Sequence, residues 1–444
     1  MARFAHAGAA TLAALALAAC SPDLTSPTPA SEAVAGVALL RTSQGPEQVV
    51  EGEVIVALRA GTDYTAVAAR HGLGVARTGY RGSFAVLRTN AGAEHAAARA
   101  LAADANVRYA EPNYLRQPTT IDSRLWAFRN PGGLNMKYST GRNSGSFLSS
   151  SYASTADADE DNIEGYATGG ADVVVGSIDT GVDFTHSEFK NADGTTRLIA
   201  GQDWYSNDAN PADEDGHGTH TTGTMIGNTV GIAGVSGAGA HVRVYVQRVC
   251  GKRGCPTSAI VSAIRAAADY GVVAMNLSLG GSTESQAEAD AIAYATSKNA
   301  IVVASAGNDG TTTVSCPACD VNAVSVAATT WADKLAPYSN QGAGLDISAP
   351  GGSCYSNTTP EGCIYSAFKG GGYEWEQGTS MAAPQVTGTA AIVASVTGLR
   401  GSALRSRLIS TADDIGAAGY DTQFGAGRLN SYRAVTGSTL AAGQ

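Results

Sequence analysis

Short apolar runs alternate with longer segments of helical pattern from about residue 166 to near the end of the chain. Short segments rich in Val, Ile and Ala predict buried strands at residues 172–178, 241–249, 272–278, 300–306 and 323–328. Apolar or amphipathic segments predict helices at residues 257–270, 284–298 and 381–396. Strands that alternate with helices in this way predict an α/β fold, a doubly wound and mostly parallel sheet with helices on both faces.

A smaller pattern of strands and helices comes before this region. Strands are predicted at residues 53–58, 84–88 and 107–114, with helices at 63–71 and 93–103. These elements predict a compact α+β domain over residues 47–116. A generic ferredoxin-like module with a separate binding role is one interpretation of it.

The first residues have the pattern of an export signal. Arg3 supplies a positive charge, and the apolar run at residues 9–19 is too short to cross a bilayer. The run ends in Leu-Ala-Ala followed by Cys20, which resembles a bacterial lipobox, so residues 1–19 are predicted to be a signal peptide and Cys20 to be lipidated. Ordinary signal-peptidase cleavage with an incidental Cys20 is the alternative. Residues 20–46, rich in Ser, Thr, Pro and Ala, are predicted to be a tether.

Residues 117–165 are predicted to be a linker that includes the start of the mature chain. Residues 139–154 are rich in Ser and Gly and are predicted to be exposed. Residues 157–164 are strongly acidic, which favours either a solvated loop or a calcium site.

Charge and cysteine usage narrow the function classes. The chain carries 29 Lys and Arg against 39 Asp and Glu, a formal net charge of −10, which argues against nucleic acid as a partner. Of the seven cysteines, the six other than Cys20 fall into three pairs that are close in sequence. They predict local disulfides in an oxidising compartment: Cys250 with Cys255, Cys316 with Cys319, and Cys354 with Cys363. A redox or zinc half-site at Cys316 and Cys319 is the alternative, but no second pair completes a metal set.

Three separate stretches carry the residues of a nucleophilic site. Ser380 stands between small residues at the start of an apolar helix, Asp179 ends a predicted strand, and His217 begins a helix of small residues. The hydroxyl of a serine is a weak nucleophile that needs a base, which an imidazole supplies near neutral pH. A carboxylate on the other ring nitrogen then fixes the tautomer and stabilises the imidazolium. The order Asp, His, Ser along the chain is that of subtilisin.

With these residues in view, the chain resembles the subtilisin-like serine proteases over about residues 166–435. The resemblance implies a peptidase domain at 166–440, an inhibitory propeptide at 47–116, and an oxyanion-hole donor in Asn308, which follows Ala-Ser-Ala-Gly. It also implies that an extended substrate pairs with Ser278, Leu279 and Gly280. The chemistry of the family requires no cofactor. A structural calcium ion is compatible with the sequence, but no metal ligand is assigned.

The resulting hypothesis is an exported serine endopeptidase, secreted or lipid-anchored, that processes itself from an inhibited precursor. Its predicted partners are protein or peptide substrates and its own propeptide, with a membrane contact only through the lipid anchor, and the enzyme is expected to be a monomer. A binding protein on an inactive protease scaffold is the alternative. His220 is a second candidate base or, with His217, a metal pair, although no third ligand is evident. An α/β-hydrolase needs a histidine after the nucleophile, and the last histidine here is His241.

Overall fold

The computed structural model describes residues 37–42, 45–118, 137–139, 147–149, 170–236, 238–354 and 362–437. The predicted signal peptide, Cys20 and the acidic segment 157–164 lie outside these residues. In the described part, no helix is long and apolar enough to cross a membrane.

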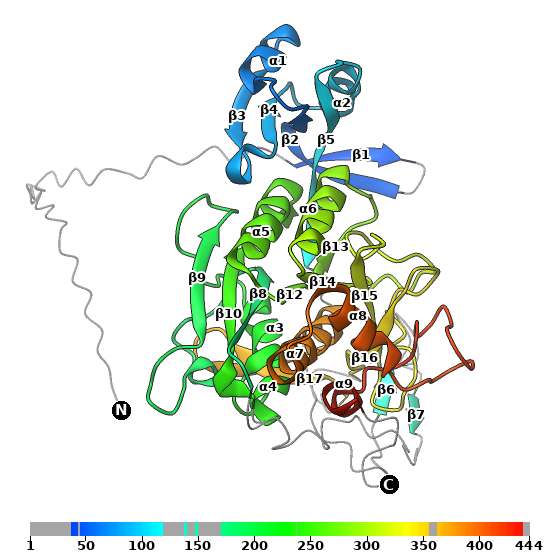
Figure 1. Cartoon of the computed structure of the whole chain (residues 1–444). Helices are drawn as coiled ribbons and strands as arrows, with labels where there is room; N and C mark the ends of the chain where they lie inside the picture. Colours follow the sequence, from blue (N-terminus) through cyan, green and yellow to red (C-terminus); the bar gives the residue numbers. More distant parts are fainter. Residues whose placement is uncertain are drawn as a thin grey trace, which may run out of the picture. The chain divides into compact units, whose positions relative to one another are not determined.

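A seven-stranded parallel sheet forms the centre of the larger domain (Figure 1). Its strand order is β16-β15-β14-β12-β8-β10-β9, and neighbouring strands in it run parallel. The strands are β8 (Val173–Asp179), β9 (Leu198–Asp203), β10 (Val242–Arg248), β12 (Ala274–Leu277), β14 (Ile301–Ser305), β15 (Ala323–Thr329) and β16 (Ile347–Pro350). The predicted doubly wound sheet is confirmed, and β9 and β16 are strands that the apolar pattern did not predict.

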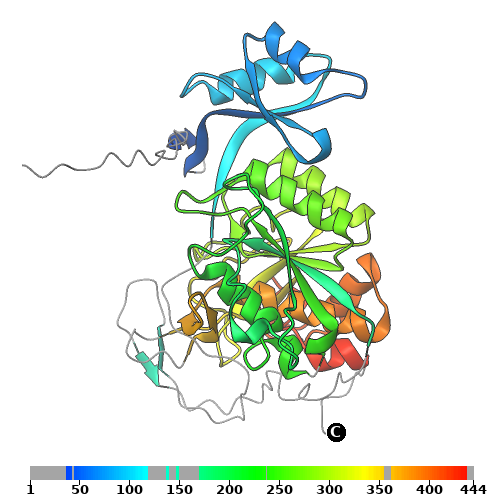
Figure 2. The same cartoon turned by 90° about the vertical axis from the view of Figure 1, so that its left-hand side faces the viewer.

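Helices cover both faces of this sheet, each face with its own apolar core (Figures 1 and 2). One face carries α5 (Thr257–Tyr270) and α6 (Gln286–Ser297). The other carries α3 (His217–Ile226), α4 (Ile232–Val235), α7 (Thr379–Thr397), α8 (Gly401–Ser410) and α9 (Ser431–Thr436). Residues 379–395 of α7 are all buried, which explains why this helix is apolar or small on every side.

The N-terminal domain is built on four antiparallel strands with two helices. Its elements follow the order β2 (Gly45–Leu58), α1 (Tyr64–Arg70), β3 (Gly74–Thr78), β4 (Ala85–Arg88), α2 (Glu94–Ala102) and β5 (Val107–Pro118). The sheet order β5-β2-β4-β3 is that of a ferredoxin-like fold. Strand β1 (Val37–Thr42) and the start of β2 lie in the segment predicted to be a tether, and β3 was not predicted.

The two faces of the N-terminal sheet have different partners. One face packs on α1 and α2 in a core of its own, which includes Val67 and Leu101. Ile55, Phe84 and Val86 on the other face belong to the same apolar cluster as α5 and α6 of the larger domain. The N-terminal domain therefore rests on the two helices that cover one face of the parallel sheet.

Disulfides join Cys250 to Cys255, Cys316 to Cys319 and Cys354 to Cys363, the pairs expected from their separations in sequence. With its sulfurs joined, the Cys316 and Cys319 pair has no thiolate to offer a metal. Among the described residues, no cluster of three or more His, Cys, Asp or Glu could hold a metal ion.

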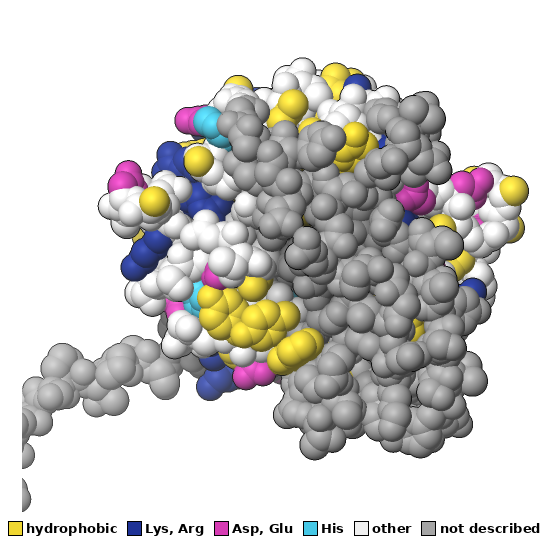
Figure 3. Space-filling model, turned by 90° about the horizontal axis from the view of Figure 1, so that it is seen from below, with side chains coloured by type: hydrophobic (Ala, Val, Ile, Leu, Met, Phe, Trp, Pro, Cys, Tyr) yellow, Lys and Arg dark blue, Asp and Glu magenta, His cyan; other side chains and the backbone are white. Residues whose placement is uncertain are grey.

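One face of the surface is seen in Figure 3. The described side chains there include a patch of hydrophobic groups with acidic, basic and histidine side chains around it. Interspersed charges of both signs are typical of a surface in contact with water.

Candidate active site

Asp179 and His217 form a buried hydrogen-bonded pair at the carboxyl end of the parallel sheet. Asp179 is the last residue of β8, and His217 is the first residue of α3. The Nδ1 atom of His217 lies 2.7 Å from Oδ1 of Asp179, and both side chains are at most 2 % exposed. The backbone N–H of Thr180 also donates to Oδ1, at 2.7 Å, so the carboxylate has a fixed orientation.

The loop before α3 is held by a second carboxylate. Asp213 accepts hydrogen bonds from the backbone N–H groups of Asp215, Gly216 and Thr219. These are donors of the kind that a helix N-terminus leaves unpaired. Gly218, the glycine after His217, leaves no room for a side chain, because a Cβ there would clash with the carbonyl of Gly181. Local backbone geometry thus places His217 against the end of β8.

Ser380 is the second residue of α7, and the structure couples it to Ser278. Pro384 lies four residues further along the helix and has no N–H group, so the carbonyl of Ser380 lacks its usual helical partner. The hydroxyl of Ser278 donates to this carbonyl at 2.7 Å instead. In return, the hydroxyl of Ser380 donates to the carbonyl of Ser278 at 3.3 Å. The substrate-binding segment predicted from the sequence is therefore bonded directly to the serine.

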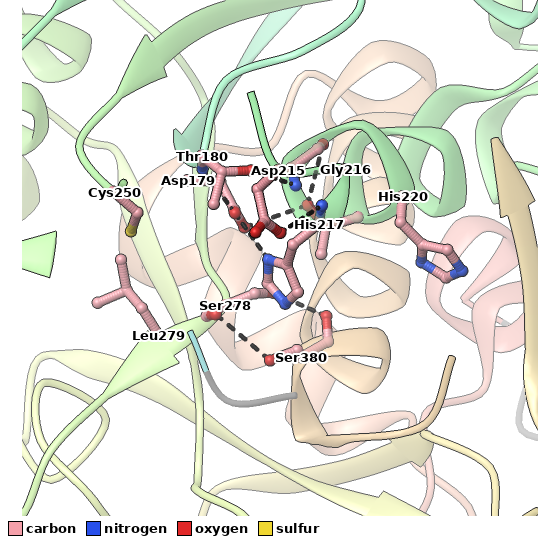
Figure 4. A network of polar contacts seen from close by, with 12 residues as sticks. Asp179, Thr180, Asp215, Gly216, His217, His220, Cys250, Ser278, Leu279 and Ser380 are labelled. Atoms are coloured by element: carbon pink, nitrogen blue, oxygen red, sulfur yellow. Dashed lines mark hydrogen bonds and ion pairs between the residues drawn. The ribbon is translucent and has the colours of Figure 1, made fainter. Parts of the chain in front are cut away.

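The imidazole of His217 faces Asp179 on one side and Ser380 on the other (Figure 4). Its Nε2 atom is buried and has no hydrogen-bond partner among the described residues. Burial disfavours the charged form of the His217 ring and by itself would lower its pKa. Attraction to Asp179 and the hydrogen bond between the two side chains have the opposite effect and outweigh it. Together with Glu376 and Asp215, they raise the pKa of His217 to about 9.

His220 lies one turn further along α3 and makes different contacts. Its side chain is fully buried, its Nε2 atom lies 3.3 Å from the carbonyl of Ile364, and it points away from Asp179 in Figure 4. Burial, with repulsion from His217, lowers the pKa of His220 to about 3, so its ring is neutral. These contacts make His220 a packing residue and leave His217 as the histidine that is bonded to the carboxylate of Asp179.

Asn308 is anchored by its oxygen. The backbone N–H and the hydroxyl of Thr379 both donate to Oδ1 of Asn308, at 2.9 and 3.0 Å. Because a backbone N–H can only donate, this contact assigns the oxygen end of the amide and directs the NH₂ end away from Thr379. The amide is thereby held next to the residue that precedes Ser380.

The predicted substrate segment receives a strand of the N-terminal domain. The strand predicted at 272–278 ends early, at Leu277, and a short strand β13 (Leu279–Gly280) follows Ser278. Strand β5 pairs antiparallel with β13, with Pro118 opposite Leu279 and Gln117 opposite Gly280. It also pairs with β11 (Cys255–Pro256). The N-terminal domain thus ends in an extended strand held between two edge segments of the larger domain.

One buried residue near this site was missed in the sequence. Glu376 ends β18 (Gly372–Glu376), four positions before Ser380, and is only 7 % exposed. The alternating residues of Gly-Tyr-Glu-Trp-Glu favour a strand, but two glutamates on one face indicate a solvated surface rather than a buried one.

The comparison with protein families decides the classification. Residues 170–427 match the description "Subtilase family", and residues 37–113 match the fervidolysin N-terminal prodomain. The chain belongs to the subtilase family.

Two relatives of this subtilase illustrate the range of similarity. It is 39% identical over 260 residues to the thermophilic serine proteinase of Bacillus sp. (strain AK1), an alignment that covers 58% of this chain and 60% of the relative. It is 34% identical over 267 residues to thermitase of Thermoactinomyces vulgaris, covering 60% of this chain and 89% of the relative. The chain therefore spans less than two thirds of the first relative and most of the second.

Solved structures show the same fold. Fervidolysin from Fervidobacterium pennivorans superposes with a TM-score of 0.65 at 23% identity, covering 88% of this chain and 62% of that one. A protease from Pseudoalteromonas arctica superposes with a TM-score of 0.53 at 28% identity, covering 62% of this chain and 91% of that one. The subtilase fold and a preceding prodomain are both present in this chain, which is a subtilisin-like serine protease.

Proposed function

We propose that this subtilase hydrolyses peptide bonds with Ser380 as nucleophile, His217 as general base and Asp179 as the orienting carboxylate. The observation that carries the proposal is the buried bond of 2.7 Å between His217 Nδ1 and Asp179, with Nε2 turned toward Ser380. His217 accepts the Ser380 proton as the hydroxyl attacks the scissile carbonyl, then donates it to the leaving amine. Water hydrolyses the resulting acyl-enzyme by the same route in reverse.

The negative charge that develops on the carbonyl oxygen needs donors. The side-chain amide of Asn308 and the backbone N–H of Ser380 are the proposed oxyanion hole. The start of α7 adds the favourable field of a helix N-terminus. This chemistry uses no cofactor, and a structural calcium ion remains a prediction.

The substrate is proposed to bind as an added strand. Protein and peptide substrates would pair with Ser278, Leu279 and Gly280 as β5 does with the β13 edge. Backbone pairing of this kind supplies affinity with little dependence on side chains.

The N-terminal domain is the proposed intramolecular inhibitor, because its last strand occupies this substrate edge. Two side chains in the middle of β5 also cap helices of the larger domain. Glu111 accepts hydrogen bonds from the hydroxyl of Ser285 and the backbone N–H groups of Gln286 and Ala287 at the start of α6. Asn113 accepts from the backbone N–H of Ser258 in α5 at 3.1 Å. These caps fix the position from which β5 runs toward Ser380.

Inhibition by the prodomain is expected to weaken as the pH rises. Burial of Glu111 outweighs the hydrogen bonds from Ser285 and the backbone of α6, and raises its pKa from 4.5 to about 7. Because the pKa of Glu111 is higher in the docked domain, protonation of Glu111 stabilises docking of the N-terminal domain. This stabilisation is fully present below about pH 4.5 and is lost as the pH rises through about 7. In the processed complex, activity should therefore appear at least roughly tenfold faster at pH 8.5 than at pH 5.5, after normalisation to fully released enzyme.

Glu111→Gln should remove most of this pH dependence, because the amide cannot titrate. Glu51→Gln is the matched control on β2, outside the helix caps, and should keep the wild-type dependence. A Glu111→Gln complex with the same pH dependence as wild type would show that another group controls release.

The register of β5 predicts where the precursor is cut. Pro118 of β5 lies opposite Leu279 of β13. Ser278 comes directly before Leu279, and its carbonyl accepts a hydrogen bond from the Ser380 hydroxyl. Residues immediately after Pro118 are therefore the first that can reach the nucleophile. The mature enzyme is expected to begin within about four residues of Pro118, at roughly 3.3 Å of chain per residue. N-terminal sequencing of the mature protein checks this, and a start well before Pro118 or well beyond residue 122 would contradict it.

Export and lipidation are proposed from the sequence alone, since residues 1–20 lie outside the described part. Cleavage before Cys20 with acylation of its thiol would anchor the precursor, and self-processing would then release the peptidase domain. The intact mass of a processing-deficient precursor distinguishes an acylated Cys20 from ordinary signal removal.

A further inference from the structure

The hairpin before the nucleophile is attached to α3 through His220. Its strands are β17 (Ile364–Phe368) and β18, and Ile364 pairs directly with Glu376. The carbonyl of Ile364 can only accept a hydrogen bond, so the Nε2 atom of His220, 3.3 Å away, carries the proton. In the neutral ring, Nδ1 of His220 is then an acceptor.

Glu376 faces this acceptor from the paired strand. Its Oε2 atom lies 4.0 Å from Nδ1 of His220, and neither atom has a hydrogen-bond partner among the described residues. A deprotonated Glu376 would place two acceptors opposite each other, whereas a protonated one can donate toward Nδ1. Burial, only partly offset by attraction to His217, raises the pKa of Glu376 to about 7. Its charge therefore changes within the neutral range.

The same carboxylate acts on His217. His217 and His220 are three residues apart on α3, so their side chains share one face of the helix. After Asp179, Glu376 contributes the next largest attraction that raises the pKa of His217. The ring of His217 becomes positively charged in the transition state, and a fixed negative charge in a buried site stabilises that state.

We propose that Glu376 is a positioning residue for the reaction: its buried carboxylate, which lies beside His220 on the helix that also carries His217, stabilises the imidazolium form of His217. The inference rests on the proposed role of His217 as the base. The titratable groups that act on Glu376 from the neighbouring elements are His217 and His220 on α3, Asp213 and Asp215 in the loop before it, and Asp179 on β8.

The pH profile of kcat/KM tests this role. Glu376→Gln keeps the shape of the side chain and can still donate to His220, but it carries no charge. The acid limb, which reports protonation of His217 in the free enzyme, should move to lower pH by about half a unit to one unit. Activity on the alkaline plateau should fall by roughly three- to tenfold. A purely structural role would lower activity at every pH and leave the acid limb in place.

Glu374→Gln is the matched control, because Glu374 lies on the same strand but is exposed. It should leave the limb unchanged. Glu376→Asp retains a carboxylate and should keep the acid limb near its wild-type position. This variant still tests the proposal if Glu376→Gln does not fold. An unmoved limb in Glu376→Gln, or an equal shift in Glu374→Gln, would overturn the proposal.

A second measurement does not depend on turnover. In full-length Ser380→Ala protein, the ring protons of His217 can be titrated by NMR with and without Glu376→Gln. The pKa of His217 should be lower in the double variant, and an unchanged value would reject the role of Glu376. Failure of the proposed function would appear separately, as an inactive wild-type enzyme.

Discussion

Replacing Ser380 with alanine is expected to abolish peptide hydrolysis and maturation together. Without the hydroxyl no acyl-enzyme forms, and only binding and the oxyanion donors remain. The expected loss in kcat is about a millionfold, a size taken from subtilisin itself. The fold should survive, because alanine favours a helix and the bond of the hydroxyl to the carbonyl of Ser278 is long, at 3.3 Å.

Two measurements on the same preparation check this expectation. Hydrolysis of a peptide substrate gives kcat, and the length of the purified chain shows whether the prodomain was removed. Ser395→Ala is a matched control, since Ser395 is also a buried serine of α7 but bonds to the carbonyl of Ala171, and it should leave kcat and processing unchanged.

The Ser380→Ala variant also decides whether the chain is a protease or a binding protein on an inactive protease scaffold. A fluorophosphonate probe should label the wild-type enzyme and not Ser380→Ala. Retained turnover in the variant, or trimming of it in a host that lacks other proteases, would show that Ser380 is not the nucleophile. An unlabelled and inactive wild-type protein would favour the binding protein.

Replacing Asn308 with alanine is expected to lower kcat strongly and leave KM nearly unchanged. The amide is directed at charge that exists only in the transition state, so its loss does not weaken ground-state binding. The loss should be about 100- to 1000-fold, again a size known for subtilisin. Steady-state kinetics with one peptide substrate separates kcat from KM.

A control is needed because Asn308 also accepts two hydrogen bonds from Thr379. Thr379→Ala removes the hydroxyl of this pair but keeps the backbone N–H and the side-chain amide of Asn308. Its effect on kcat should be much smaller than that of Asn308→Ala. An effect of Asn308→Ala confined to KM would place the amide in substrate binding.

Much of the fold was predictable because its strongest signals are local. Central strands of a parallel sheet are buried on both faces, so β8, β14 and β15 are near-continuous runs of apolar and small residues. The helix at 257–270 was predicted with the bounds that the structure gives, because its amphipathic pattern ends at Gly271, which has the left-handed conformation that favours glycine at a helix end. The fold class and the preceding α+β domain followed from such patterns.

Edge strands were not predictable in the same way. Strand β9 lies at one edge of the sheet, and its three apolar residues are followed by Gly, Gln and Asp. Strand β13 has only two residues, and its partner is β5 of the other domain. Short edge strands are specified by the segment that pairs with them, and this information is not local.

The sequence by itself determined the family and predicted the chemistry from an aspartate, a histidine and a serine in subtilase order, each at the end of a strand or the start of a helix. The tertiary structure decided which other groups act on them. Glu376 is buried only because the β17–β18 hairpin packs on α3, and Glu111 caps α6 only because the prodomain docks there. Burial and electrostatic contacts depend on which distant segments meet, so a sequence pattern cannot assign them in advance.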